Sequence, residues 1–400
     1  MHPLHEGMLA AQERDIRTMH RDTLTVESRE APLWGDPRIA QSTLSLHGPV
    51  GQDPFGSIDC FAALPGGGVA VLDRRGGEEA RLLVLDANGT LERQLGRPGS
   101  GPGEFGRPSG NCLAADRDGT IFMLDGSNSR INRWTRAGDP LPAIVLGFTS
   151  GGPAPYIVVG DDGSIFVRKM FRPARPDCLT DASPFGFIRF DASGNPSDTV
   201  RLATEHLAHC PSHVNDPTDL LLPTNWGSIL HSRSDRLGFV AINGLARHPR
   251  VLEVNRDVTP VALSKVERRQ LEGLGRWTAR VSEGRIPARD IARFRPIIHA
   301  LYADPSPRIW VVMGGDPIAI DPAPYPRTER KGIDPPIRSV IEQLRLGAFM
   351  SDGRWLGEIV LPVSVDASEV SLSFGRTDLW TSHLDAEGIP TLTRWVLGGS

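Results

Sequence analysis

Residues 57–63, Ser-Ile-Asp-Cys-Phe-Ala-Ala, return at residues 109–115 as Ser-Gly-Asn-Cys-Leu-Ala-Ala. The same spacing of 52 residues repeats a glycine turn and a Leu-Asp pair, which stands at residues 72–73 and again at residues 124–125. Self-similarity at a fixed period of about 50 residues is typical of propellers, solenoids and other repeat folds. The repeat is therefore the observation from which we predict the fold.

Each repeat contains short β-rich segments separated by glycine turns, such as Val69–Leu72 and Thr120–Leu124. Turn signals every 8–12 residues or so, with no helical pattern between them, favour an antiparallel all-β meander. One unit of four strands cannot bury both of its faces, whereas units repeated around an axis can.

Weaker copies of the unit continue to the end of the chain. They lie at residues 160–167 with 187–194, 236–241 with 250–254, 308–312 with 353–359, and 378–382 with 391–395. Six units of four strands predict an all-β fold, a six-bladed β-propeller of four-stranded antiparallel blades. We expect one propeller domain over residues 23–398 and an N-terminal tail over residues 1–22.

A circular array must join its first and last blades. Two N-terminal segments, Thr23–Glu27 and Thr43–Leu46, alternate like an edge strand. We expect one of them to complete the final blade.

Three insertions interrupt the array, and the first is a loop over residues 203–224. In the second, Ser264–Glu267 has the spelling of a capping box and predicts a short helix that ends at Gly273. In the third, Asp334–Pro336 is typical of a helix start, and apolar residues follow at helical spacing. These apolar residues are Ile337, Val340, Ile341 and Leu344. We expect both short helical insertions to cover blade edges or one mouth of the channel.

The segment that enters the second repeat carries a family signature. Residues 97–108 have the G-x-G-x-G-x-F-x-x-P form of an entry loop, and a D-G turn follows at residues 118–119. Asp125 ends the second β-rich segment, and residues 128–131 have the N-x-R-I form of a third strand. Together these residues resemble one full NHL repeat.

The whole chain resembles bacterial six-bladed propeller proteins, many of which lie outside the cytoplasm behind a signal or lipoprotein leader. Met1–His20 lacks the apolar core of a signal peptide. The resemblance therefore implies an extracytoplasmic protein with a leader upstream of the sequence given.

Composition narrows the classes of function. A net charge of −4 over 400 residues gives no general electrostatic reason to bind nucleic acid or an anionic membrane. No apolar run is long enough to predict a transmembrane helix. The serine-hydrolase motif G-x-S-x-G, the zincin motif H-E-x-x-H and the P-loop motif are all missing from the sequence. We expect a monomer without a nucleic-acid partner.

Asp59 and Asn111 occupy matching positions, one residue before the cysteine of each repeat. Neighbouring side chains alternate between the faces of a strand, so this pair would face the channel if the cysteines do not. Carboxylate and amide oxygens suit calcium, and the pair resembles part of the ligand set of the calcium-dependent propeller lactonases. The alternative is that both side chains bond to backbone groups in turns.

A second candidate is basic. Residues 265–295 carry nine basic and four acidic residues. Arginine binds carboxylates and phosphates well, so Arg276, Arg280 and Arg285 are candidate contacts for an anionic ligand at the channel mouth. The alternative is a solvated helical cover.

Four cysteines allow three disulfide pairings, and no C-x-x-C pair is present. We expect Cys60 and Cys112 on the inner strands of neighbouring blades, where a bridge needs Cα atoms within about 7 Å. Two buried thiols are the favoured interpretation, and a disulfide between them is the alternative. A Cys178–Cys210 disulfide would pin the loop at residues 203–224.

Three histidines accompany Cys210 in this loop. The cluster consists of His206, His209, Cys210 and His213. Such side chains can bind zinc, although histidines in a loop are more often solvated, and we assign no metal.

These observations favour a non-enzymatic propeller that binds a protein partner or a small ligand on one channel face, without a cofactor. The alternative is a calcium-dependent hydrolase or lyase, similar to a lactonase, that acts at the central channel. Propellers support both kinds of function.

Overall fold

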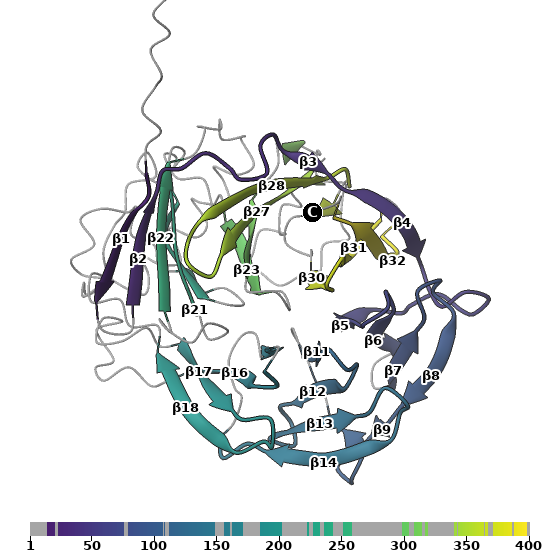
Figure 1. Cartoon of the computed structure of the whole chain (residues 1–400). Coiled ribbons are helices and arrows are strands. Elements are labelled where there is room, and N and C mark those ends of the chain that lie inside the picture. The colour runs from purple at the N-terminus through teal and green to yellow at the C-terminus, as the bar shows by residue number, and fades with distance from the viewer. Residues whose placement is uncertain are drawn as a thin grey trace, which may run out of the picture.

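The computed structural model shows twisted sheets set around a common centre (Figure 1). The structure describes residues 14–20, 23–75, 79–106, 108, 112–148, 156–160, 162–170, 185–201, 222–223, 227–232, 236–242, 251–257, 298–303, 308–313, 317–318, 340–341, 343–363, 365–366, 371–385 and 388–397. Within these ranges every regular element is a β-strand and none is a helix. The fold is therefore all-β, and its antiparallel sheets are arranged like the blades of a propeller.

Three consecutive sheets in the described part of the chain are four-stranded antiparallel meanders. The first contains β5 (Ile58–Ala63), β6 (Val69–Arg75), β7 (Glu79–Leu85) and β8 (Leu91–Leu95). The next contains β11 (Leu113–Ala115), β12 (Ile121–Asp125), β13 (Arg130–Trp134) and β14 (Pro140–Val145). The third contains β15 (Ile157–Val159), β16 (Ile165–Met170), β17 (Phe185–Phe190) and β18 (Pro196–Arg201).

Each of the larger sheets that come later in the chain includes one or two strands from the N-terminal part of the chain. One is ordered β19 (Leu222–Pro223), β20 (Gly227–Ser232), β21 (Arg236–Ile242), β22 (Val251–Asp257), β2 (Thr23–Ser28) and β1 (Ile16–His20), with β1 and β2 last. Another is ordered β23 (Ile298–Ala303), β24 (Arg308–Met313), β27 (Leu344–Met350), β28 (Trp355–Leu361) and β3 (Arg38–Ile39). The last is ordered β30 (Ser371–Phe374), β31 (Asp378–Leu384), β32 (Pro390–Val396) and β4 (Gln41–Leu46).

Two small sheets lie in the connections. One pairs β9 (Arg97–Pro98) with β10 (Glu104–Phe105) within the entry loop of the second repeat. The other contains β25 (Pro317–Ile318), β26 (Val340–Ile341) and β29 (Val365–Asp366).

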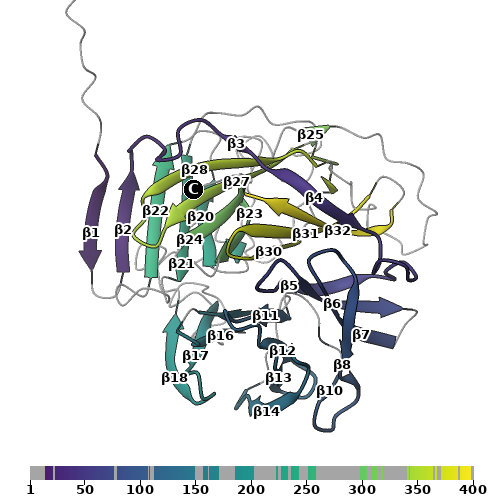
Figure 2. The same cartoon turned by 45° about the vertical axis from the view of Figure 1, so that its right-hand side comes forward.

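The segment from β2 to β4, which we call the N-terminal belt (residues 23–46), runs along the outer edges of three sheets (Figure 2). β2 pairs with β22 and β3 with β28, both in parallel, and β4 pairs antiparallel with β32. Of the two segments predicted to meet the last blade, Thr43–Leu46 does so and Thr23–Glu27 joins a different sheet. Ile16–His20, which we predicted as part of a tail, forms strand β1 because pairing with β2 satisfies its backbone groups.

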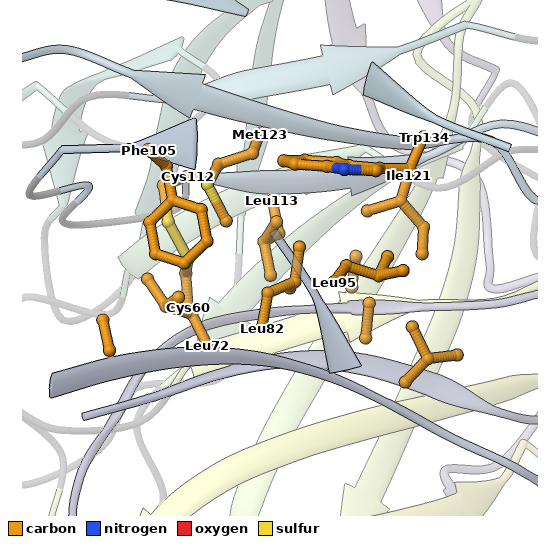
Figure 3. Close-up of a cluster of buried hydrophobic side chains, with 14 of the residues drawn as sticks. Cys60, Leu72, Leu82, Leu95, Phe105, Cys112, Leu113, Ile121, Met123 and Trp134 are labelled. Atoms are coloured by element: carbon orange, nitrogen blue, oxygen red, sulfur yellow. A yellow bond between two sulfur atoms is a disulfide. The ribbon is translucent and has the colours of Figure 1, made fainter. Parts of the chain in front are cut away.

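Apolar side chains that alternate along the strands fill the spaces between neighbouring sheets. Ala70 and Leu72 of β6 belong to the cluster shared with the β11–β14 sheet (Figure 3). Val69 and Val71 of the same strand pack on the other side, in a cluster that includes Trp380 of the last sheet. The alternation read from the sequence thus becomes a core on each face of the sheet.

Cys60 and Cys112 form a disulfide between the first two sheets, inside the cluster of Figure 3. Their Cα atoms are 5.7 Å apart, and both residues are buried. The prediction of two buried thiols is therefore wrong. The reason is that β5 and β11 lie close enough around the centre for the equivalent cysteines to meet. Cys178 and Cys210 lie outside the described residues.

The Leu-Asp pair of the repeat has a structural role. Asp73 Oδ1 accepts a hydrogen bond from Gly56 N at 2.8 Å, and Asp125 accepts one from Gly106 N at 3.2 Å. Both aspartates are fully buried. Each carboxylate thus ties the end of a second strand to the loop that leads into the inner strand of the same sheet.

The prediction of a helix after residue 334 is wrong for the residues of this segment that the structure describes. Val340 and Ile341 form β26, and Leu344 begins β27, which pairs with β24 and β28. Val340, Ile341 and Leu344 therefore belong to two different strands, and pairing between strands overrides so short a pattern. The helix predicted to end at Gly273 and most of the loop at residues 203–224 lie outside the described residues.

Candidate functional site

We call one end of the sheets the entry end, because the chain enters each inner strand there. In the first sheet Ile58, at the start of β5, pairs with Asp73 near the end of β6. Figure 1 places β5, β11 and β30 nearest the centre. β5 contacts both β11 and β30, and β11 also contacts β15. Side chains at the entry end are therefore contributed by several sheets.

Asp59 lies at the start of β5, and its carboxylate is held by Arg74 of β6. Arg74 Nε donates to Asp59 Oδ2 at 2.7 Å, and Nη2 donates to the same oxygen. Ser57 Oγ donates to Asp59 Oδ1 at 3.3 Å. A metal ion at this carboxylate would lie beside a guanidinium of like charge. The arrangement is an ion pair in which the arginine provides the positive charge.

Arg74 also reaches beyond its own sheet. Its Nη2 donates to the carbonyl oxygen of Pro108, on the segment leading to β11, at 3.2 Å. The side chain keeps 21% of its surface exposed. A guanidinium has five N–H donors, so this arginine can contact an anion at the entry end while it holds Asp59.

Tyr156 and Arg168 are the second polar pair at the entry end, and our reading of the sequence missed them. Arg168 N donates a hydrogen bond to Tyr156 O at 3.0 Å. The equivalent bond in the preceding sheet joins Leu124 N to Cys112 O. Both side chains are buried, with 5% of Tyr156 and 7% of Arg168 exposed. Burial lowers the pKa of Arg168, and the electrostatic interaction with Tyr156 opposes that shift.

The signal for this pair was present in the sequence as a departure from the repeat. β6 and β12 carry Leu-Asp at residues 72–73 and 124–125, whereas β16 carries Arg168-Lys169 at the equivalent place. Lys169 Nζ lies 4.8 Å from the ring centre of Phe148. The third sheet therefore presents two cations where the first two present a leucine and an acid.

A third polar group joins the last sheet to the residue that directly follows the N-terminal belt. His47 Nε2 lies 3.4 Å from Asp385 Oδ2, and Asp385 Oδ1 accepts a hydrogen bond from Ile389 N at 2.8 Å. His383, at the end of β31, is buried, and burial lowers its pKa.

The other predicted site residues are not placed by the structure. Asn111, Arg276, Arg280 and Arg285 lie outside the described residues, as does the histidine cluster near Cys210. Among the residues that are described, no group of three or more His, Cys, Asp or Glu side chains is arranged to hold a metal ion. The calcium and zinc hypotheses thus remain predictions.

The chain is similar to solved structures over most of its length. A protein from Bacteroides fragilis described as exported has a TM-score of 0.43 and 11% identity, over 94% of this chain and 99% of that chain. A DUF4221 family member from Bacteroides vulgatus has a TM-score of 0.44 and 11% identity, over 89% and 97%. A catalytically inactive variant of virginiamycin B lyase from Staphylococcus aureus, with quinupristin, has a TM-score of 0.40 and 15% identity, over 90% and 99%.

With TM-scores below 0.5, the fold assignment depends on the strand pairing described above. No family model and no curated protein matches the sequence. No helix among the described residues is long and apolar enough to cross a membrane.

Proposed function

We propose that this chain is a six-bladed, NHL-type propeller without enzymatic activity that binds a partner or small ligand at the entry end of its channel. The observation that carries the proposal is the ion pair of Arg74 with Asp59. It places a partly exposed guanidinium, rather than an unpaired carboxylate, at the start of an inner strand. Such a position suits recognition of an anionic group on the ligand.

The rest of the site supports binding on a rigid surface. The disulfide between Cys60 and Cys112 fixes the first two inner strands relative to each other. Asp73 and Asp125 tie the entry loops of the same two sheets to their second strands. A preformed site of this kind loses little conformational entropy when a ligand binds.

We also propose that the protein works outside the cytoplasm. Disulfides persist in oxidising compartments and are rare in the cytosol. The Cys60–Cys112 disulfide and the resemblance of the whole chain to bacterial six-bladed propeller proteins support the same location.

The alternative, a calcium-dependent hydrolase or lyase, loses support at Asp59. Calcium prefers several anionic or neutral oxygen ligands, and the Asp59 carboxylate is already neutralised by Arg74. The enzyme hypothesis would therefore need its ligands from elsewhere on the channel.

Thermal unfolding of the full chain in the presence of succinate, inorganic phosphate or glucose, at constant ionic strength, tests the proposal. We expect a saturable rise of at least about 2 °C with an anion and none with glucose. Arg74→Gln should weaken this effect. Arg117→Gln is the control, because that arginine is 59% exposed on the turn at the opposite end of β12.

Two results would overturn the proposal. One is the lack of any saturable effect of either anion on the wild-type chain. The other is calcium-dependent turnover of a lactone or ester that EGTA abolishes, which would establish the enzyme instead.

A further inference from the structure

The sheet that contains β22 extends further from the centre than its neighbours. The first three sheets end at a fourth strand, which is β8, β14 or β18, whereas this sheet adds β2 and then β1 beyond β22. Figures 1 and 2 both show β1 as the outermost strand on its side of the molecule. Neighbouring strands are about 4.8 Å apart, so β1 lies about 10 Å beyond β22. No strand in the described part of the chain pairs with the outer edge of β1.

The outer edge of β1 lacks the features that protect other outer strands. The pairing of β4, β8, β14 and β18 with their inner neighbours is interrupted by a register shift in each case. β14 also carries prolines at residues 140 and 142. Such shifts and prolines discourage pairing with another chain. β1 pairs with β2 in unbroken register and contains no proline, so its edge is suited to accept a further strand.

β1 is held in place from within the chain. Asp15 Oδ1 accepts hydrogen bonds from Arg29 N at 2.8 Å and from Glu30 N at 3.0 Å, which fixes the start of the strand. The apolar side chains of β1 nevertheless meet solvent, with Ile16 49% and Met19 55% exposed. A preformed edge of this kind loses little conformational entropy when it pairs.

The register of the hairpin shows which backbone groups of β1 point to the open edge. His20 pairs with Thr23, and a pair that is joined by only two residues is a hydrogen-bonded pair. Hydrogen-bonded and non-hydrogen-bonded pairs alternate along an antiparallel ladder. The N–H and C=O groups of Arg17 and Met19 therefore point away from β2.

These outward groups are complementary to those of a second copy of the same strand. Two β1 strands can run antiparallel about a two-fold axis that passes between their Thr18 residues. Arg17 of each copy then lies opposite Met19 of the other copy, and the outward N–H and C=O groups of both residues are satisfied. A second copy of this chain is therefore an occupant that fits the edge without any further residue.

Charge selects this register. Moving the axis by one residue in either direction would place Arg17 opposite Arg17 or opposite Arg21 of the other copy, and like charges directly opposite each other destabilise a strand pair. The axis at Thr18 instead sets Arg14 opposite Asp22 of the other copy. Residues 21 and 22 lie outside the described residues, so this match is one of sequence order.

We propose that two copies of this chain associate by antiparallel pairing of their β1 strands, which joins the two propellers through one continuous sheet. The contact involves few residues, and small interfaces are typical of transient association. We therefore expect a dissociation constant of roughly 1–100 µM. The proposal replaces the expectation of a monomer drawn from the sequence alone, and it is independent of the ligand proposed above.

Disulfide trapping of the full chain tests the register. The two Thr18 residues would form a non-hydrogen-bonded pair with Cα atoms about 4.5 Å apart, which is within the range of a disulfide. Thr18→Cys should therefore give a covalent dimer under mild oxidation. Ile16→Cys is the matched control on the same strand and face, because its two copies would be displaced by about 13 Å along the strands. The wild-type chain measures any trapping through the native cysteines.

Sedimentation equilibrium between about 1 and 200 µM measures the affinity without a cross-link. Arg14→Asp should weaken association at least about threefold, because it sets like charges opposite each other twice in the dimer. Adding Asp22→Arg to this variant should restore the wild-type affinity. β1 separates the two residues within one chain, so rescue reports a contact between copies. Arg117→Asp makes the same change of net charge at a residue that is 59% exposed elsewhere, and should have no effect.

Three results would overturn the proposal. One is a wild-type chain that stays monomeric up to about 200 µM. Another is trapping that is equally efficient, or equally absent, in Thr18→Cys and Ile16→Cys. The third is a dimer that persists in Met19→Pro, because proline removes an N–H from the open edge and keeps the hydrogen bonds between β1 and β2.

Discussion

The carboxylates of Asp73 and Asp125 make the same backbone contact in neighbouring sheets, each accepting the N–H of the glycine that ends an entry loop. An arginine of the third strand lies beside each carboxylate, Arg81 in one sheet and Arg130 in the next. The Leu-Asp pair, which recurs at the same place in both repeats, therefore specifies this hydrogen bond as well as a buried strand. We call the hydrogen bond between the aspartate and the loop glycine the tether.

Asp73→Asn should strongly destabilise the protein. The carboxylate is fully buried, and its loss leaves the Arg81 guanidinium without its anion. We expect the free energy of unfolding to fall by about 3 kcal/mol, as measured by urea denaturation. Asp53→Asn is the control, because Asp53 pairs with Arg75 but is 81% exposed, and it should cost little. Equal losses in the two variants would contradict the tether.

The disulfide should contribute substantially to stability. It closes a loop with a sequence separation of 52 residues, for which the chain-entropy model gives about 4 kcal/mol. Cys60→Ala with Cys112→Ala should lower the unfolding temperature to that of the reduced wild-type protein. Alkylation of the unfolded, unreduced chain checks the bond directly, since four modified cysteines would show that no disulfide formed.

The unfolding free energy should depend on pH through His383. Burial holds the pKa of its imidazole below the usual value. The electrostatic interaction with Asp385 opposes this shift, and the interaction with His47 adds to it. The folded state therefore binds fewer protons than the unfolded state, whose pKa is about 6.5. Stability should be complete above that pH and decline as pH falls toward the pKa of the folded protein.

Urea denaturation at several pH values between about 5 and 8 measures this dependence. His383→Gln should flatten the curve, whereas His47→Gln, which removes the partner of Asp385, should leave the decline in place. A wild-type curve that rises as the pH is lowered would have the wrong sign.

A chain that begins at Gly56 should lose cooperative unfolding. It lacks β4, whose Leu46 is buried in the cluster that contains Trp380 and Leu392. A chain that begins at Thr23 loses only β1 from the described strands, an outer strand with exposed side chains, and serves as the control. Calorimetry distinguishes them, and a sharp transition in the shorter chain at the wild-type temperature would rule out the closure by β4.

The repeat made much of the fold predictable. Residues 57–63 and 109–115 place β5 and β11, and the Leu-Asp pairs mark the ends of β12 and, two residues earlier, of β6. The disulfide was not predictable, because matching positions in the sequence do not fix the distance between neighbouring inner strands. The path of the N-terminal belt was not predictable either, since edge pairing depends on which outer strand is unpaired rather than on composition.

The candidate site was predictable only in part. Asp59 was singled out, but its partner Arg74 was not, because an ion pair between adjacent strands depends on the bulge between Ile58 and Cys60. Arg168 could have been found by comparing the third unit with the first two. A polar residue at a buried repeat position is the signal, and a search limited to known motifs overlooks it.

The path of the N-terminal belt also sets the order in which the molecule can be completed. The belt is synthesised before its partners β22, β28 and β32, the last of which ends at Val396. The hydrogen-bonding groups of the belt strands therefore stay open to water and to other chains until these partner strands, β32 included, have been synthesised. Assembly cannot finish blade by blade behind the ribosome, and a chain released early would carry unprotected strand edges that promote aggregation.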